Sequence, residues 1–403
     1  MTPPGPPSDD PARPLAGIRV VDLTTFLSGP VAARTLADLG ADVVRVEPPR
    51  GDPTRAGTGL APGDPPSAFY LALHRDRRAI VLDLKTTAGR GVLRDLAAAS
   101  DVLLENFRPG VTERLAIRDE DLRPHNPRLV YCTITGFGPD GPYSQLPATD
   151  GAVQAFGGVL ELTGAPDGFG LPVPLPFADL LAGATAAQGV LAALVARAGH
   201  GRGTHLDVSM LEALLGWLLV ADRERTLAPP TTLVVSGSDD VPILVQTSLH
   251  FQGRLAALLA AVPGCDALTD DPRFATRESR HQHLDEYLAL VRRAFRSRPS
   301  AAWLEALGAI GIPASRVQRI DDALAHPQLA RRGAIVGVDV PGLGPRAVLA
   351  GPIRFDGRRR SDTTPPPTLG EHTGAVLRDV LGYEDGRVAA LAADGAFGER
   401  PVR

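Results

Sequence analysis

The sequence predicts an α/β protein, in which a Rossmann-like large domain with a mostly parallel sheet carries a smaller inserted α+β domain. Near the start, a strand, a helix and a second strand follow one another within about thirty residues, which is the pattern of a βαβ unit. Short apolar strands and helical segments then keep alternating as far as about residue 220. Beyond that point helices predominate, and from residue 335 short strands alternate with Pro and Gly turns.

The elements of the first half follow from apolar spacing. Residues 18–23 form a buried strand, Gly29-Pro30 a turn, residues 31–39 a helix that ends at Gly40, and residues 42–47 a second strand. The remaining segments of this half are strands at 79–84, 101–105, 129–135 and 205–208, and helices at 89–99, 182–196 and 211–220.

A change of composition marks the domain boundaries. Charged residues and then Ala-Pro-Pro interrupt the pattern at 222–230. We expect a strand at 241–246, helices at 255–260, 283–297 and 302–307, strands near Val340, Val348 and Ile353, and a last helix at 373–381. The predicted division is a disordered tail at 1–13, the N-terminal part of the large domain at 14–221, a linker and small domain at 222–332, and a return linker with the rest of the large domain at 333–403.

Composition excludes several classes of protein. The formal net charge of −4 over 403 residues disfavours nucleic-acid binding, which normally requires a basic domain. The two cysteines are not spaced as metal ligands, and so few cysteines favour a reducing cytoplasm. The sequence has no run of about 18 apolar residues, as a membrane span would need. We therefore expect a soluble cytoplasmic protein without a metal.

The first βα turn is where a dinucleotide-binding fold carries Gly-x-Gly-x-x-Gly. Residues 25–30 instead read Thr-Phe-Leu-Ser-Gly-Pro, so ordinary dinucleotide binding is disfavoured.

Ordered blocks of sequence carry a family resemblance. They include PLAGIRVVDL at 14–23, LADLGADVVRVE at 36–47, GDPTR at 51–55, LDLK at 82–85, DVLLENFRPG at 101–110, GFG at 136–138, DPRF at 271–274, GIP at 311–313 and LGEHT at 369–373. Taken in this order, they make the chain resemble the class III (CaiB/BaiF-type) coenzyme A transferases. The resemblance implies acyl-CoA and carboxylic acid substrates, coenzyme A as a substrate rather than a tightly bound cofactor, and an interlocked homodimer.

Two carboxylates are candidate catalytic residues. Asp179 lies in an apolar run at the start of a helix, where a structural role as helix N-cap is the alternative. The resemblance matches Asp179 to the family's catalytic aspartate, which implies transfer of coenzyme A through a covalent aspartyl intermediate. It also places Asp150, accompanied by Gln154, in the same site. For Asp150 a helix N-cap remains an equally good interpretation.

The resemblance further implies which residues bind coenzyme A. Pantetheine would lie along Phe26, Leu27 and Ser28, and the nucleotide would lie near Lys85, Asn106, Phe107 and Arg114. Cationic side chains suit phosphates, and an amide and an aromatic ring suit adenine. The pair Arg77 and Arg78 is either a solvated basic pair or a phosphate contact.

Three departures from the family bear on function. Thr149 stands where the racemase branch carries a His, so the two acid–base groups that racemisation needs are not both present. Leu27 replaces the Gln of the oxalate-using members, which disfavours oxalate. Residues 225–250 lack the family's usual Gly-Asn-x-His-Pro segment. Coenzyme A transfer is favoured, and an acyl-CoA racemase or epimerase and a catalytically silent acyl-CoA binding protein are the alternatives.

Overall fold

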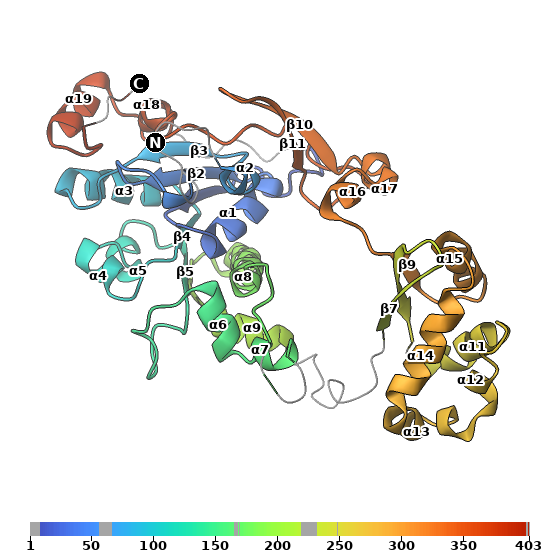
Figure 1. Cartoon of the computed structure of the whole chain (residues 1–403). Helices are drawn as coiled ribbons and strands as arrows, with labels where there is room; N and C mark the ends of the chain where they lie inside the picture. The colour runs from blue at the N-terminus through green and yellow to red at the C-terminus, as the bar shows by residue number, and fades with distance from the viewer. Residues whose placement is uncertain are drawn as a thin grey trace. The chain divides into compact units, whose positions relative to one another are not determined.

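The computed structural model describes residues 9–55, 67–164, 168, 170–218, 232–247, 249–399 and 402. The chain divides into two compact units, a large one made of Met1–Leu218 with Pro327–Arg403, and a small one made of Leu219–His326. Figure 1 shows the elements of both, coloured along the chain.

Six parallel strands form the main sheet of the large unit in the order β3-β2-β1-β4-β5-β6. Their bounds are β1 Arg19–Asp22, β2 Asp42–Glu47, β3 Arg78–Val81, β4 Val102–Glu105, β5 Val130–Thr135 and β6 His205–Ser209. The predicted α/β class with a parallel sheet is confirmed, and β2 has the predicted bounds. Because every strand is parallel, all the strands end at the same edge of the sheet, and the loops that follow them gather there.

Helices cover both faces of this sheet, as an all-parallel sheet requires. Alternate residues of β1 show the two faces, since Val20 belongs to the core with α1 and α8 and Val21 to the core with α3 and the C-terminal helices. The helices up to the small unit are α1 Ser28–Asp38, α2 Ala68–Leu73, α3 Thr87–Ala98, α4 Val111–Leu115, α5 Asp119–Leu122, α6 Asp150–Phe156, α7 Val159–Leu162, α8 Phe177–His200 and α9 Met210–Leu218, with a 3-10 turn at Pro53–Arg55.

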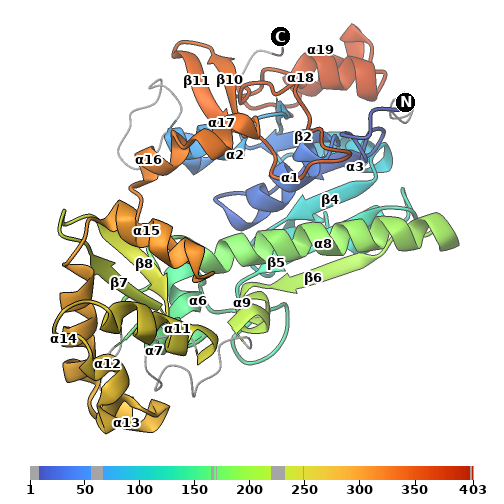
Figure 2. The ribbon, with the colours of Figure 1, turned by 90° about the vertical axis from the view of Figure 1, so that its right-hand side faces the viewer.

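The longest of these helices is α8, which Figure 2 shows running along the β5–β6 part of the sheet. Its 24 residues are apolar enough to cross a membrane by length and composition. However, Ala182, Ala186 and Val190 are buried in the core with α1, and one such helix is weak evidence of a membrane span. The alanine-rich face lets α8 lie close to its neighbours.

The C-terminal segment returns to the large unit and completes it. It contains α17 Pro327–Arg331, the antiparallel pair β10 Ile335–Val340 and β11 Gly344–Leu349, α18 Thr373–Ala375, a π-helical turn at Val376–Val380 and α19 Asp385–Ala393. Val376, Leu377 and Val380 join the core on the α3 face of the sheet. Figure 1 shows α18 and α19 on the opposite side of the sheet from α1.

The small unit packs helices on a three-stranded antiparallel sheet. Its strands are β7 Thr232–Ser236, β8 Pro242–Gln246 and β9 Ala314–Arg316, and its helices are α11 Leu249–Ala260, α12 Ala267–Asp270, a 3-10 turn Pro272–Phe274, α13 Arg277–Gln282, α14 Leu284–Phe295, α15 Ser300–Ala309 and α16 Ile320–Leu324. Trp303, Phe295 and Ile243 are fully buried at its centre. This unit therefore has a hydrophobic core of its own.

Some predicted elements differ from the structure. The expected turn at Gly29-Pro30 is wrong, because both residues lie in the first turn of α1. Proline fits there, since the N–H groups of the first turn make no hydrogen bond within the helix. The expected strand near Ile353 is also wrong, since β11 ends at Leu349. The strand β7 and the helix α19 were not predicted. Of the predicted tail, Ala12 is buried and Arg13 pairs with Asp362.

Candidate active site

A crevice site is expected between β1 and β4, where the strand order reverses. The chain moves outward from β1 to β2 and β3, and then returns to place β4 on the other side of β1. Ligands of open α/β sheets bind at this switch point, beyond the carboxyl ends of the strands. Asn106, directly after β4, joins the two loops. Its side chain accepts a hydrogen bond from the Thr25 N–H and donates one to the Thr25 carbonyl, both at 2.8 Å.

The loop after β1 presents the three residues assigned to pantetheine. Phe26 is 60% exposed and has a φ of 60°, a left-handed conformation that is strained for a bulky side chain. Leu27 and Ser28 are buried, and Ser28 begins α1. Of the three side chains, only Phe26 is largely open to solvent, and strain at such a position is typical of functional loops.

Asp179 lies in the first turn of α8, next to the first turn of α1. Gly183, one turn further along α8, permits this proximity. A Cβ at this position would clash with the Ser28 carbonyl oxygen and lie 2.7 Å from the Cβ of Val31. The absence of a side chain therefore brings the N-termini of α1 and α8 together. The Ser28 hydroxyl and backbone N–H donate hydrogen bonds to the Asp179 carboxylate.

The environment of Asp179 makes its carboxyl group a weaker acid than usual. Burial, followed by the negative charge of Asp150, raises the pKa of Asp179 to about 6, against the opposing effect of the two Ser28 hydrogen bonds. Asp179 is thus ionised at neutral pH but remains basic. A half-buried carboxylate with a perturbed pKa at a switch point is a candidate functional group.

Asp150 is the first residue of α6, yet its side chain caps α8 instead. Its Oδ1 accepts hydrogen bonds from the backbone N–H groups of Ala178 at 2.7 Å and Asp179 at 3.2 Å. Its Oδ2 accepts one from Gln154 Nε2 at 2.6 Å. Asp150 is thus a helix cap, although of α8 and not of its own helix, and it lies beside Asp179; its part in the reaction stays a prediction.

Beneath the loop after β1 lies a buried ion-pair network that the sequence analysis missed. Asp22, the last residue of β1, pairs with Arg77 at 2.8 Å and with Arg45 at 3.2 Å, and all three side chains are almost fully buried. Arg77 also donates hydrogen bonds to the carbonyl of Pro30 in α1. Arg77 is therefore neither solvated nor a phosphate contact, and it holds α1 in place. Arg78 pairs with Asp42.

The residues assigned to the nucleotide follow β3 and β4 at the carboxyl edge of the sheet. Lys85 follows β3 and is exposed, and Arg114 is exposed on α4. Phe107 is half-buried, and its N–H donates to the carboxyl group of Glu105 at 2.9 Å. Burial raises the pKa of that carboxyl group to about 7. The sheet topology thus places these residues at the same edge as Ser28.

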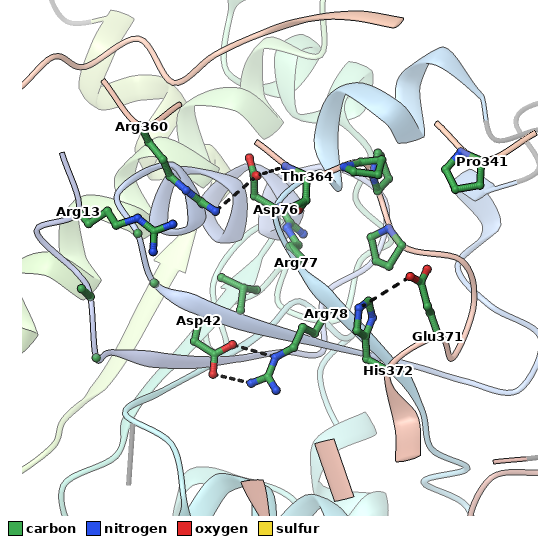
Figure 3. Close-up of a pocket in the computed structure, with 18 residues that line it drawn as sticks. Arg13, Asp42, Asp76, Arg77, Arg78, Pro341, Arg360, Thr364, Glu371 and His372 are labelled. Atoms are coloured by element: carbon green, nitrogen blue, oxygen red, sulfur yellow. Dashed lines mark hydrogen bonds and ion pairs between the residues drawn. The ribbon is translucent and has the colours of Figure 1, made fainter. Parts of the chain in front are cut away.

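A cavity of about 670 Å³ lies at the other edge of the sheet, where β2 and β3 begin. Figure 3 shows Arg78 directed at Asp42 and Arg360 at Asp76 in its wall. Arg78 and Arg360 are thus each paired with an acidic residue of the same wall. Because Asp179 lies at the carboxyl edge, this cavity is separate from the candidate active site. Among the described residues, no cluster of His, Cys, Asp and Glu suits a metal ion.

Comparison with known proteins agrees with this arrangement. The model of CoA-transferase family III matches residues 15–373. The formyl-CoA:oxalate CoA-transferase of Streptomyces avermitilis is 33% identical, with 96% of this chain and 100% of the relative covered. The acetyl-CoA:oxalate CoA-transferase of Acetobacter aceti is also 33% identical, with 91% and 96% covered. The crystal structure of a CaiB/BaiF family protein from Brucella suis superimposes with a TM-score of 0.77 at 32% identity, and covers 92% of this chain and 100% of its own. The chain therefore belongs to the family III, or CaiB/BaiF, coenzyme A transferases and is an enzyme of that type.

Proposed function

We propose that this enzyme transfers coenzyme A from an acyl-CoA donor to a carboxylic acid acceptor through a covalent intermediate on Asp179. The observation that carries the proposal is the position of Asp179. A basic carboxylate lies where the N-termini of α1 and α8 meet, beside the loop that follows β1. Such a carboxylate is ionised at neutral pH and reactive enough to attack a thioester.

In the first half of the reaction, an Asp179 oxygen attacks the thioester carbonyl carbon of the donor. A carbon–oxygen bond forms, the carbon–sulfur bond breaks and coenzyme A leaves as a thiolate. The thiolate then attacks the aspartyl carbonyl of the mixed anhydride. The donor acid departs as a carboxylate, and a thioester remains on Asp179.

In the second half, the acceptor carboxylate attacks the aspartyl thioester and again releases the thiolate. The thiolate attacks the acceptor carbonyl of the new anhydride, so that acyl-CoA leaves and the Asp179 carboxylate is regenerated. The tetrahedral intermediates formed at the aspartyl carbonyl carry an oxyanion on Asp179 itself, which the Ser28 N–H, a donor to that carboxylate, would stabilise. No proton is gained or lost over the cycle, so no separate acid–base pair is needed.

Coenzyme A would lie along the carboxyl edge of the sheet. Phe26, Leu27 and Ser28 would bind pantetheine, while Lys85, Phe107 and Arg114 would bind the nucleotide with Asn106. The exposed cations Lys85 and Arg114 suit the phosphates. In the free enzyme, the Asn106 amide is engaged by Thr25. The active form is proposed to be a cytoplasmic homodimer with interlocked chains.

The identity of the two substrates needs a direct test. The relatives named above carry formyl, acetyl and oxalate in their names, whereas Leu27 disfavours oxalate here. Formyl-CoA and acetyl-CoA are therefore the donors to test first, each with a panel of mono- and dicarboxylic acids.

The experiment is to trap the acyl-enzyme with hydroxylamine and locate the adduct by mass spectrometry. We expect a hydroxamate on the peptide that contains Asp179, and none in the Asp179→Ala variant. If the protein instead exchanged the α-proton of an acyl-CoA into deuterated water without forming an adduct, it would be a racemase. If it bound acyl-CoA with neither reaction, it would be a silent binding protein.

A further inference from the structure

We propose that Asp150 is a positioning residue for the nucleophile: it caps the N-terminus of α8 through the backbone N–H groups of Ala178 and Asp179 and holds a negative charge beside Asp179. The inference deepens the proposed function and rests on it for its catalytic meaning. It assigns Asp150 no contact with substrate and no proton transfer.

The geometry of the cap is the first step. The N-cap position of α8 is Pro176, whose side chain cannot accept a hydrogen bond. Two of the unpaired N–H groups of the first turn, those of Ala178 and Asp179, donate to Asp150 from α6 instead. Asp150 and Asp179 are therefore joined through the backbone of the nucleophile itself.

Gln154 fixes the cap in place. It is fully buried, and its Nε2 donates to Asp150 Oδ2 and to the carbonyl of Leu175 at 3.1 Å. Its Oε1 accepts a hydrogen bond from the N–H of Val173 at 2.9 Å. Both polar groups of the Gln154 side chain therefore bind the segment before α8 and hold it against α6.

The charge of the cap is the second step. The N-terminus of a helix carries a partial positive charge that stabilises a nearby carboxylate and so makes it a weaker nucleophile. Asp150 opposes this effect, because its own charge acts on Asp179 and raises that group's pKa, second only to burial. A more basic carboxylate forms the mixed anhydride more readily.

Other charged groups do not share this role. The elements packed against α8 contain these other ionisable groups: Arg34 and Asp38 of α1, Tyr131 and Cys132 of β5, Glu161 of α7, Arg197 and His200 at the far end of α8, His205 and Asp207 of β6, and Glu212 of α9. Among the residues that the structure describes, Asp150 is the charged group that contributes to the pKa shift of Asp179. Removal of its charge should therefore be visible directly at Asp179.

The test is a ¹³C NMR titration of carboxyl-labelled free protein, with the Asp179 signal assigned from the Asp179→Asn variant. In the wild type we expect a titration midpoint at about pH 6. In Asp150→Asn, which keeps an oxygen for the two N–H groups and loses the charge, we expect the midpoint about one pH unit lower. The acid limb of kcat/KM, which reports groups of the free enzyme, should shift by the same amount.

The matched control is Gln154→Leu, which loosens the cap and leaves the charge of Asp150. It should lower Tm and leave the Asp179 midpoint where it is. In Asp150→Asn, the new amide nitrogen faces Gln154 Nε2, and both groups are donors. Asp150→Ser therefore provides a second uncharged cap. Tm is measured for all variants. A midpoint that does not move in either uncharged variant, or a wild-type midpoint near the ordinary 3.8, overturns the inference.

This titration needs no substrate. The inference can therefore fail while hydroxylamine still traps an adduct on Asp179. Conversely, a shifted midpoint without an adduct would leave the positioning of Asp179 intact and refute the transferase mechanism.

Discussion

Replacement of Asp179 by asparagine should stabilise the folded protein at neutral pH. The pKa of this carboxyl group rises from an ordinary 3.8 to about 6 on folding, mainly because of burial. A shift of one unit corresponds to about 1.4 kcal/mol, so ionised Asp179 costs the folded state at most about 3 kcal/mol. Asparagine removes the charge and keeps an oxygen for the Ser28 donors. Because Asp179 retains some contact with water, we expect a gain of about 1–2 kcal/mol.

The sign of the pH dependence makes this prediction specific. The folded-state pKa lies above the unfolded value, so the penalty is fully present above about pH 6 and disappears as the pH falls toward 3.8. Urea unfolding of wild type and Asp179→Asn at pH 7.5 and pH 4.5, at one protein concentration, measures the difference. The gain should be largest at pH 7.5 and fall to about a third of that value at pH 4.5. An equal gain at both values, or a loss at pH 7.5, would refute the electrostatic argument.

Two further substitutions test the framework of the site. Gly183→Ala should lower the free energy of unfolding by about 1–3 kcal/mol and slow acylation, because its Cβ clashes with the first turn of α1. The control Gly189→Ala, on the same helix, makes only an ordinary contact and should be neutral or stabilising. Urea unfolding and hydroxamate yield compare the two variants. Arg77→Met should cost about 3 kcal/mol in urea unfolding, because it leaves Asp22 buried with one partner fewer, while the half-exposed Arg78→Met should cost about 1 kcal/mol or less. Equal losses within either pair would contradict the packing or the burial argument respectively.

The first half of the fold could be predicted from the sequence because its signals are local. Apolar residues in short runs specify buried strands, and β2 has the predicted bounds at Asp42–Glu47. Predicted element boundaries were wrong where a local sequence signal is compatible with two structures. Gly29-Pro30 is typical of a turn, yet proline is equally suited to the first turn of a helix.

The candidate nucleophile was also accessible from the sequence. An acidic residue at the start of an apolar helix, within ordered family motifs, singled out Asp179. The same reasoning placed Asp150 nearby, and could not decide between a cap and a site residue. That choice depends on which helix the side chain caps, and local sequence does not specify the partner.

The arrangement around the nucleophile was decided by tertiary structure alone. Asp150 caps a helix that begins 27 residues later, and Arg77 pairs with Asp22 across 55 positions of the chain. Asn106 likewise joins two loops that are 81 residues apart. The periodicity of apolar residues indicates which face of a strand or helix is buried, and so which segments form strands and which form helices. Hydrogen bonds and ion pairs between elements depend on how closely the helices pack, and Gly183 permits the close approach of α1 and α8. The spacing of residues along the sequence does not indicate that distance.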